Sequence, residues 1–258
     1  MKEQEYILKN AESFELKDIF DCGQCFRWNE QQDGSYIGVF KNNVLNVSKE
    51  KNDIIFKGIC EGNIEEIVKD YFDLNRNYEE IKEVLSKIDD NLKNSIEYGS
   101  GIRILNQDLW ETIISFIISA NNNIPRIKGI IERISKKYGN EIEYNNEKYY
   151  TFPTPEQLKD VTVQEYRELG LGFRDIRLYE TTKMIIEKQV DLEELRKNPN
   201  TKEVRDKLLT LSGVGPKVAD CILLFSDLKR FEVFPIDVWV RRVMNDLYIK
   251  NEDENKVS

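Results

Sequence analysis

Short runs of alternating or β-branched residues dominate the N-terminal region of the chain. The clearest are YIGVF (36–40), NVLNVS (43–48) and DIIFKGI (53–59). Polar turns separate them, first at Lys41-Asn42 and then at Glu50-Lys51-Asn52. Adjacent short strands with such tight connections are typical of an antiparallel meander. We therefore expect a small antiparallel sheet in this region.

The spacing of apolar residues changes to a helical period near Asn63, and from about residue 77 we expect only helices. The segments with an apolar stripe are 64–72, 77–88, 109–120, 124–139, 173–188, 202–211, 217–225 and 238–247. A boundary is expected near Tyr98-Gly99-Ser100-Gly101. The pattern predicts an α+β protein, with a small antiparallel β-rich N-terminal domain and its flanking helices over residues 1–98 and a larger all-α domain over residues 99–258.

Composition places the protein among ordinary globular proteins. Its 258 residues suit one large or two modest domains, and 40% apolar residues can form a sizeable core. No apolar run approaches the ~20 residues of a membrane span, and the N-terminal MKEQEYILKN has no signal-peptide core. We therefore expect a soluble intracellular protein without a membrane partner.

Cysteine and histidine usage limits the chemistry that is open to the chain. The four cysteines are Cys22, Cys25, Cys60 and Cys221, and without a secretory context we expect no disulfides. One C-x-x-C pair without a second pair nearby favours two packed thiols over a zinc site, so no metal site is predicted. Because the chain has no histidine, acid–base or covalent chemistry must use Asp, Glu, Lys, Cys, Ser or Tyr.

The net charge of −9 argues at first sight against a nucleic-acid partner. A local group of cations nevertheless follows the predicted helix 109–120. The stretch 121–137 contains one acid, Glu132, and five cations, Arg126, Lys128, Arg133, Lys136 and Lys137. Charge alone therefore leaves the question of a nucleic-acid partner open.

The stretch LSGVGPKVAD (211–220) predicts a tight turn between two helices. Gly213 and Gly215 precede a helix that Pro216 begins, and backbone N–H groups at such a helix N-terminus can bind a phosphate. Lys217 lies at the positive end of the helix dipole, where a cation is unfavourable. The alternative, an ordinary connection with Lys217 in solvent, is about equally consistent with this motif alone. Cys221 lies one turn beyond Lys217 on the same helix face.

Asp237, in FPIDVWVRR (234–242), stands at the start of a predicted apolar helix. Aspartate is a favourable N-cap, which stabilises a helix by ~1 kcal/mol. A cap and a catalytic carboxylate are compatible, since one oxygen can cap the helix while the other acts.

Two further stretches have both a structural and a functional interpretation. In ISANNNIPRI (118–127) an apolar helix ends in three asparagines, which favour a helix C-cap but could also form a polar tip that enters a groove. In DCGQCFRW (21–28) Gly23 could mark a close approach of the backbone to a ligand, or the start of a packed strand.

Together these four stretches resemble the helix–hairpin–helix DNA glycosylases, and among them the 8-oxoguanine DNA glycosylase/AP lyase branch. The hairpin LSGVGPKVADC, followed 20 residues after Lys217 by Asp237, is similar to the superfamily's signature. SANNNIPRI and CGQCFRW are similar to the 8-oxoguanine branch. The resemblance covers residues 20–248 and implies a helix–hairpin–helix fold for the helical domain.

The resemblance implies a bifunctional enzyme of base excision repair and suggests roles for four residues. Lys217 would be the nucleophile that attacks C1′ of the damaged nucleotide and forms a Schiff base, and its placement would favour the reactive neutral amine. Asp237 would assist departure of the base and stabilise positive charge on the sugar. Cys221 would pack on the flipped base, and the Gly23 carbonyl would accept a hydrogen bond from N7–H, which guanine lacks.

The resemblance also implies contacts with double-stranded DNA that contains oxidised guanine. Asn121 would fill the gap left by the extruded nucleotide, Arg126 and Arg174 would read the opposite cytosine, and Phe173 would act as a wedge. Gly213 and Gly215 would hold the DNA backbone. The resemblance implies no cofactor and leaves open a structural monovalent cation or calcium ion at the hairpin turn. It further implies a monomer in the cytoplasm, associated with the nucleoid in a bacterium.

Two departures from the family pattern stand out. Trp239 occupies a place where relatives can carry a polar phosphate contact. The chain ends in a polar tail, NEDENKVS (251–258), where relatives continue into helices that complete the base pocket. We therefore expect the 258-residue chain to bind DNA but to excise 8-oxoguanine poorly, and a longer form to restore excision.

Two other functions remain open at this point. An alkylated-base glycosylase of the same superfamily would keep the aspartate without the lysine, whereas a non-catalytic helix–hairpin–helix module would need neither. An endonuclease III-like enzyme would carry a four-cysteine iron–sulfur loop, for which the sequence has no counterpart.

Overall fold

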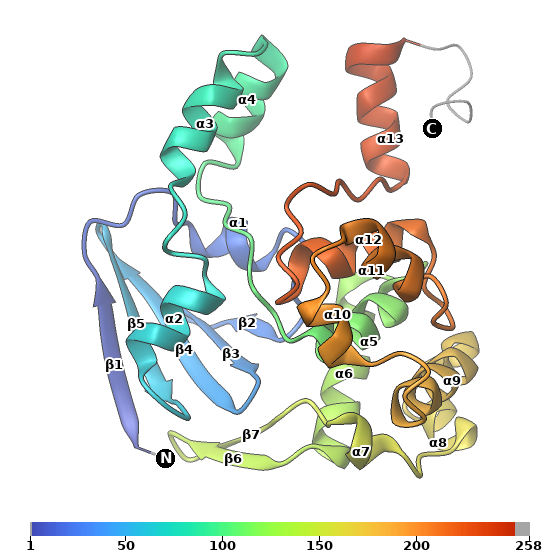
Figure 1. The fold of residues 1–258 in the computed structure, drawn as a ribbon. Coiled ribbons are helices and arrows are strands. Elements are labelled where there is room, and N and C mark those ends of the chain that lie inside the picture. The colour runs from blue at the N-terminus through green and yellow to red at the C-terminus, as the bar shows by residue number, and fades with distance from the viewer. Residues whose placement is uncertain (1, 251–258) are drawn as a thin grey trace.

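Five antiparallel strands form the N-terminal sheet in the computed structural model, which describes residues 2–250 (Figure 1). The strands, in the spatial order β1-β5-β4-β3-β2, are β1 (Glu3–Leu8), β2 (Trp28–Glu30), β3 (Tyr36–Phe40), β4 (Asn43–Glu50) and β5 (Asp53–Ile59). The three predicted strands are confirmed, and two edge strands, β1 and β2, were not predicted. The short strand β2 depends on a tertiary contact, because the Trp28 ring lies where a Cβ of Gly38 would be.

An aromatic cluster fills the space between this sheet and the short helices beside it. Phe20, from α1 (Leu16–Phe20), stacks on Trp28 with ring centroids 4.3 Å apart. Phe72 follows α2 (Ile64–Tyr71) and packs against both Phe20 and Trp28. The side chain of Asn63 caps α2, as expected for the residue at which the helical period begins.

The helical domain is built around α5 (Leu109–Ser119), in which nine of 11 residues are buried. Its sequence is too apolar for a surface helix, and helices from later in the chain pack around it. These further helices are α6 (Ile124–Tyr138), α7 (Pro155–Leu158), α8 (Val163–Glu168), α9 (Asp175–Ile186), α10 (Leu192–Lys197), α11 (Thr201–Leu208) and α12 (Pro216–Phe225). No described helix combines the length and apolar character that crossing a membrane requires.

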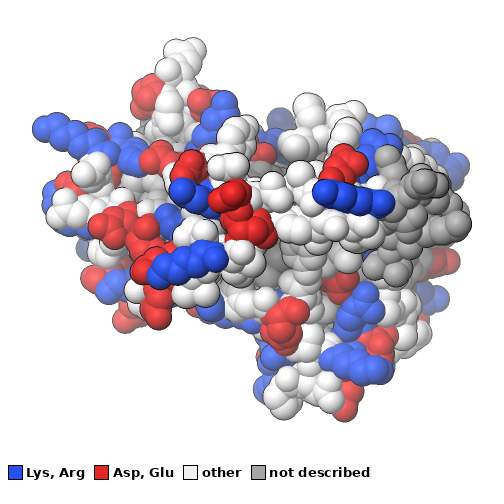
Figure 2. Space-filling model, turned by 90° about the horizontal axis from the view of Figure 1, so that it is seen from above, with Lys and Arg blue, Asp and Glu red and all other residues white. Residues whose placement is uncertain are grey.

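Three helices project from the body at the top of Figure 1. They are α3 (Tyr78–Ser86), α4 (Asp90–Tyr98) and α13 (Val238–Met244), which continues as a π-helical turn over Asn245–Ile249. None of the three helices has a buried residue, and Val243 and Leu247 of the predicted stripe are exposed. Seen from above, charges of both signs are interspersed with uncharged surface (Figure 2). The predicted polar tail from Asn251 lies outside the described residues.

The expectation of only helices beyond residue 77 is wrong for one segment. A β-hairpin, β6 (Glu141–Tyr144) and β7 (Glu147–Tyr150), interrupts the helical domain. Asn145 and Asn146 form its turn with φ of 53° and 61°, which asparagine tolerates better than most residues. Ile142 and Tyr144 pack against residues of the N-terminal sheet, so burial selects the strand conformation. The α+β fold class itself is confirmed.

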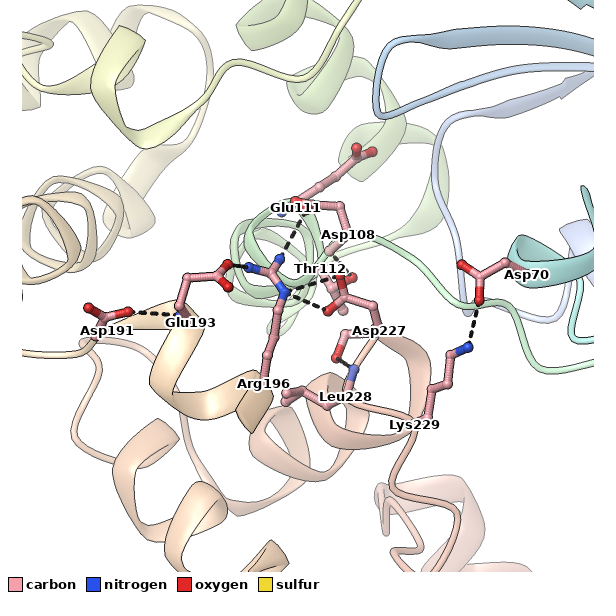
Figure 3. A network of polar contacts seen from close by, with 11 residues as sticks. Asp70, Asp108, Glu111, Thr112, Asp191, Glu193, Arg196, Asp227, Leu228 and Lys229 are labelled. Atoms are coloured by element: carbon pink, nitrogen blue, oxygen red, sulfur yellow. Dashed lines mark hydrogen bonds and ion pairs between the residues drawn. The ribbon is translucent and has the colours of Figure 1, made fainter. Parts of the chain in front are cut away.

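Arg196 of α10 is the centre of an ion-pair network that ties three segments together (Figure 3). Its Nη2 lies 3.4 Å from Oδ2 of Asp108, the N-cap of α5, and its Nε lies 3.2 Å from Oδ2 of Asp227. Nearby, Lys229 Nζ lies 2.7 Å from Asp70 Oδ1 and links this region to the N-terminal part of the chain. These contacts hold the start of α5 and the end of α12 together.

A buried charged pair joins the strand region to α5. Arg27 Nε lies 3.9 Å from Oε1 of Glu111, and Arg27 Nη2 donates a hydrogen bond to the carbonyl oxygen of Tyr150 in β7. Burial raises the pKa of Glu111 to about 7, although the nearby Arg27 acts to lower it. The folded state therefore favours the protonated carboxyl group more than the unfolded state does.

We expect Glu111→Gln to change how stability depends on pH. Because the folded-state pKa is raised, the stability associated with Glu111 is complete below about pH 4.5 and is lost as the pH rises through about 7. Relative to the parent, the variant should gain about 1–3 kcal/mol in free energy of unfolding between pH 5 and pH 8. Urea denaturation across this range measures it, with Glu143→Gln as the control because Glu143 is an exposed residue of β6. Parallel pH curves for parent and Glu111→Gln would contradict the assignment.

Candidate active site

The predicted hairpin turn lies between α11 and α12. Gly213 has a φ of +85°, and a Cβ there would lie 2.8 Å from Cδ of Arg177 and 3.2 Å from Ile117. Gly215 is the N-cap of α12 with a φ of −92°, and the space around its Cβ position is open. The two glycines therefore serve different purposes. Gly213 permits the turn, whereas Gly215 leaves the helix N-terminus accessible.

Lys217 lies in the first turn of α12, above an aromatic side chain. Its Nζ is 5.4 Å from the ring centroid of Phe116, a buried residue of α5. Phe116 in turn contacts Phe26 at 5.7 Å in an edge-to-face arrangement. Phe116 was not predicted from the sequence, since an aromatic residue within an apolar helix carries no separate signal. Its neighbour Phe26, however, belongs to the stretch DCGQCFRW (21–28), which the sequence did single out.

Cys221 faces the same space as Lys217, as the helical spacing predicts. Burial raises the pKa of the Cys221 thiol to about 11, against the opposing effects of the Lys217 charge and of a hydrogen bond with it. The negative charge of Asp237 also acts to raise this pKa, so the Asp237 carboxylate lies within electrostatic range of the thiol. Lys217 and Cys221 therefore face each other on α12, and Asp237, 20 residues beyond Lys217 in the sequence, lies within electrostatic range of Cys221.

Asp237 is the N-cap of α13, as predicted. Its Oδ1 accepts hydrogen bonds from the backbone N–H groups of Trp239 and Val240, each at 2.9 Å. Because both bonds go to Oδ1, Oδ2 takes no part in the cap. The carboxylate is therefore held by one oxygen while the other is directed elsewhere.

The three asparagines after α5 have different contacts. Asn122 Nδ2 donates a hydrogen bond to the Ile118 carbonyl and ends α5, whereas Asn123 accepts from the Arg126 N–H and caps α6. Asn121 is exposed and has a φ of 51°. The structural interpretation applies to Asn121 as well, because its positive φ directly after the C-cap Ala120 is a conformation that asparagine favours at a helix end, and Asn121 stays exposed.

Arg174 supports this turn from within the protein. It is 2% exposed, its Nε donates to the Ala120 carbonyl at 2.9 Å, and its Nη2 donates to the Asn121 carbonyl at 2.7 Å. By contrast, Arg126 is exposed and its Nη2 donates to the Gly170 carbonyl at 3.2 Å. Of the two arginines singled out in the sequence, one is therefore part of the scaffold and the other faces solvent.

Phe173 is 56% exposed, and two guanidinium groups contact its ring. The Cζ atoms of Arg174 and Arg177 lie 4.2 Å and 5.2 Å from its ring centroid. Arg177 also contacts the hairpin at Gly213, so it connects Phe173 with the turn before α12. Arg177 was not predicted from the sequence, where nothing distinguishes it from other arginines on helix surfaces.

Gly23 lies in an open turn between two cysteine thiols. Its φ is +86°, and no atom lies within 4 Å of its Cβ position. Within residues 2–250, no donor forms a hydrogen bond with the Gly23 carbonyl. Cys22 is exposed and Cys25 is buried, and burial raises the pKa of the Cys25 thiol well above its ordinary value.

Two protein-family models match consecutive parts of the chain. The N-terminal domain of 8-oxoguanine DNA glycosylase matches residues 6–113, and the HhH-GPD superfamily of base excision DNA repair proteins matches residues 114–258. The apo crystal structure of Clostridium acetobutylicum 8-oxoguanine glycosylase/lyase is 44% identical, with a TM-score of 0.92 over 99% of this chain and 90% of that chain. The chain belongs to the 8-oxoguanine DNA glycosylase family.

Three further comparisons with known proteins extend this result. The C. acetobutylicum protein in complex with dsDNA containing cytosine opposite to 8-oxoG has a TM-score of 0.91 at 44% identity and covers 98% of this chain and 88% of that chain. A probable N-glycosylase/DNA lyase of Methanothermobacter thermautotrophicus is 33% identical over 205 residues, 72% of this chain and 64% of that protein. A 3-methyladenine DNA-glycosylase from Archaeoglobus fulgidus, at 23% identity and a TM-score of 0.74 over 98% of this chain and 90% of that chain, shows the shared fold alone. The chain spans less than two thirds of the length of the curated relatives it matches.

The two hairpin glycines should respond differently to substitution in this family member. Gly213→Ala places a side chain at positive φ against Arg177 and Ile117, which should lower the free energy of unfolding by about 1–3 kcal/mol. Gly215→Ala, with an ordinary φ and open space, should cost less than about 1 kcal/mol. Chemical denaturation of the two variants measures the difference, and equal losses would contradict the separate roles.

Proposed function

We propose that this chain excises 8-oxoguanine from duplex DNA and cleaves the strand at the resulting abasic site through a covalent lysine intermediate. The observation that carries the proposal is the contact of Lys217 with Cys221 on α12, with the carboxylate of Asp237, the N-cap of α13, in electrostatic range of the same thiol. The name of the C. acetobutylicum relative, 8-oxoguanine glycosylase/lyase, supports it.

The side chains suit attack by an amine on a sugar carbon. The neutral Lys217 amine would form a bond to C1′ while the bond to the base breaks and its electron pair leaves with the base. The carboxylate of Asp237, held through Oδ1, would stabilise the positive charge on the sugar through Oδ2. The resulting Schiff base would permit cleavage of the strand on the 3′ side. Cys221 is not a competing nucleophile near neutral pH, because its pKa of about 11 keeps the thiol protonated.

Recognition of the damaged base would use the open turn at Gly23. The proton on N7 distinguishes 8-oxoguanine from guanine, and the Gly23 carbonyl would accept a hydrogen bond from it. The neutral Cys221 thiol is suited to pack against the face of the base once the base has left the stack. One neutral hydrogen bond contributes only ~0.5–1.5 kcal/mol net, so the preference over guanine needs these contacts together.

The DNA duplex would be held by the hairpin and by the turn after α5. Open N–H groups beyond Gly215 would bind a backbone phosphate. Asn121 would enter the space of the extruded nucleotide, with the exposed Phe173 as the wedge beside it. Arg126 is exposed and suited to direct contact with the opposite cytosine. The bonds of Arg174 to the turn carbonyls support a role in holding that turn.

Substitution of Lys217 tests the covalent step. Borohydride should trap a protein–DNA adduct with a duplex that contains 8-oxoguanine, and Lys217→Gln should abolish trapping because no amine remains to form the Schiff base. Lys159→Gln is the matched control, since Lys159 pairs with Glu156 on an exposed helix end. DNA binding by gel shift should survive in both variants. Equal trapping by Lys217→Gln, or stronger trapping with 3-methyladenine DNA, would contradict the proposal.

Substitution of Asp237 by Asn separates its role as the N-cap of α13 from the role of its negative charge in base excision. Asn is also a good N-cap, so Asp237→Asn should change the free energy of unfolding by less than about 1 kcal/mol. Loss of the negative charge should lower the rate of base excision by about 100-fold. Single-turnover kinetics and thermal unfolding measure the two effects. An unchanged excision rate would show that Asp237 serves only as a cap.

A further inference from the structure

Gln107 lies where the Gly23 turn, the segment that leads into α5 and the end of α12 meet. Its side-chain Nε2 donates one hydrogen bond to the Gln24 carbonyl at 2.7 Å and another to the Phe225 carbonyl at 3.2 Å. An amide nitrogen has two hydrogens, so both are used in this position. One bond is directed to the residue that follows Gly23, and the other to the last residue of the helix that carries Lys217 and Cys221.

The main chain of Gln107 is attached to α12 independently of the side chain. Its N–H donates to the Phe225 carbonyl at 3.2 Å, and its carbonyl accepts from the Asp227 N–H at 2.7 Å. Gln107 and Ser226 form an isolated parallel bridge. Removal of the side chain therefore leaves the segment on α12 in place and breaks the bond to the Gln24 backbone carbonyl.

Gln24 itself is anchored to the same segment. It is 1% exposed, its Nε2 donates to the carbonyls of Ile19 and Arg103 at 2.9 Å and 2.8 Å, and its Oε1 accepts from the Leu105 N–H at 2.9 Å. A rotated amide would place Oε1 against two carbonyl oxygens, so this orientation is strongly favoured. The residue next to Gly23 is thus held through both its side chain and its backbone.

We propose that Gln107 is a positioning residue for base recognition, which sets the location of the Gly23 carbonyl relative to α12. The inference rests on the proposed function, in which the Gly23 carbonyl and Cys221 contact the same flipped base. These groups come from opposite ends of the chain, and a displacement of about 1 Å is enough to weaken a directional hydrogen bond. The Gln107 amide is the side-chain contact that joins the two parts at this point.

The hydrogen bond from Gln107 to the Gln24 carbonyl should matter only for duplexes in which the damaged base is still attached to its sugar. Strand cleavage at a preformed abasic site needs Lys217 and the DNA contacts, but it has no base for the Gly23 carbonyl to recognise. Excision of 8-oxoguanine needs Lys217 and the DNA contacts, and it also needs recognition of the base by the Gly23 carbonyl. Loss of the Gln107 side chain should therefore lower excision selectively, and a general loss of structure would lower both activities.

The experiment compares Gln107→Ala and Gln107→Met with the parent chain. Met fills nearly the same volume without a donor, so it separates the hydrogen bonds from packing. Single-turnover release of 8-oxoguanine from a duplex with opposite cytosine should fall about three- to tenfold in both variants, since one hydrogen bond changes an equilibrium by about two- to tenfold. Cleavage of a preformed abasic duplex should stay within about twofold. Gln31→Ala is the control, because within the described residues its exposed amide donates only to the nearby Asn29 carbonyl.

The outcomes distinguish this inference from the proposed function. A parent chain that neither excises 8-oxoguanine nor cleaves abasic sites would overturn the proposed function. A parent chain that excises 8-oxoguanine, with an unchanged ratio of the two activities in both variants, would overturn the role of Gln107. Full activity in Gln107→Met would assign the effect to packing, and a parallel fall of both activities with a lowered Tm would assign it to general stability. Either result would also overturn the inference.

Discussion

The rest of the structure depends on the burial of α5 between the helices that follow it in the sequence. Its apolar residues supply the centre of the larger core, and removal of such area from water stabilises the fold by about 25 cal/mol per Å². Polar contacts hold both ends of this helix, through Asp108 with Arg196 at the start and through Arg174 with the Ala120 carbonyl at the end. The buried helix therefore sets the position of Phe116, above which Lys217 lies, and of the turn that carries Asn121.

Several residues of the candidate site also stabilise local structure. Asp237 caps α13, Asn123 caps α6 and Gly213 permits the hairpin turn. A cap contributes only ~1 kcal/mol, but it holds a side chain or a turn in one orientation. Orientation is what a site assembled from distant segments needs. The open oxygen of Asp237 and the open N-terminus of α12 both result from this arrangement.

Local patterns predicted much of the fold and part of the candidate site. The strands 36–40, 43–50 and 53–59 have tight turns and cross-strand partners next to them in sequence, so their alternation is a sufficient signal. Strands β1 and β2 pair at the edges of the sheet, and β2 depends on the close approach of Trp28 to Gly38. The hairpin at Asn145 packs on a sheet that lies about a hundred residues earlier in the chain. Such strands gain their burial from distant segments, which short-range periodicity does not report.

The sequence by itself determined the α+β class, the capping of α13 by Asp237, the turn at Gly213 and the shared helix face of Lys217 and Cys221. Each of these features follows from a local rule that acts within a few residues: the φ angle that a residue prefers, the residue types that cap a helix, or the spacing of residues on one helix face. Only the tertiary structure decided that Phe116 lies beneath Lys217, that Arg174 is buried against the Asn121 turn, and that Gln107 joins Gln24 to α12. These contacts connect groups far apart in sequence, and their stability comes from hydrogen bonds and apolar area buried only when the whole chain has folded.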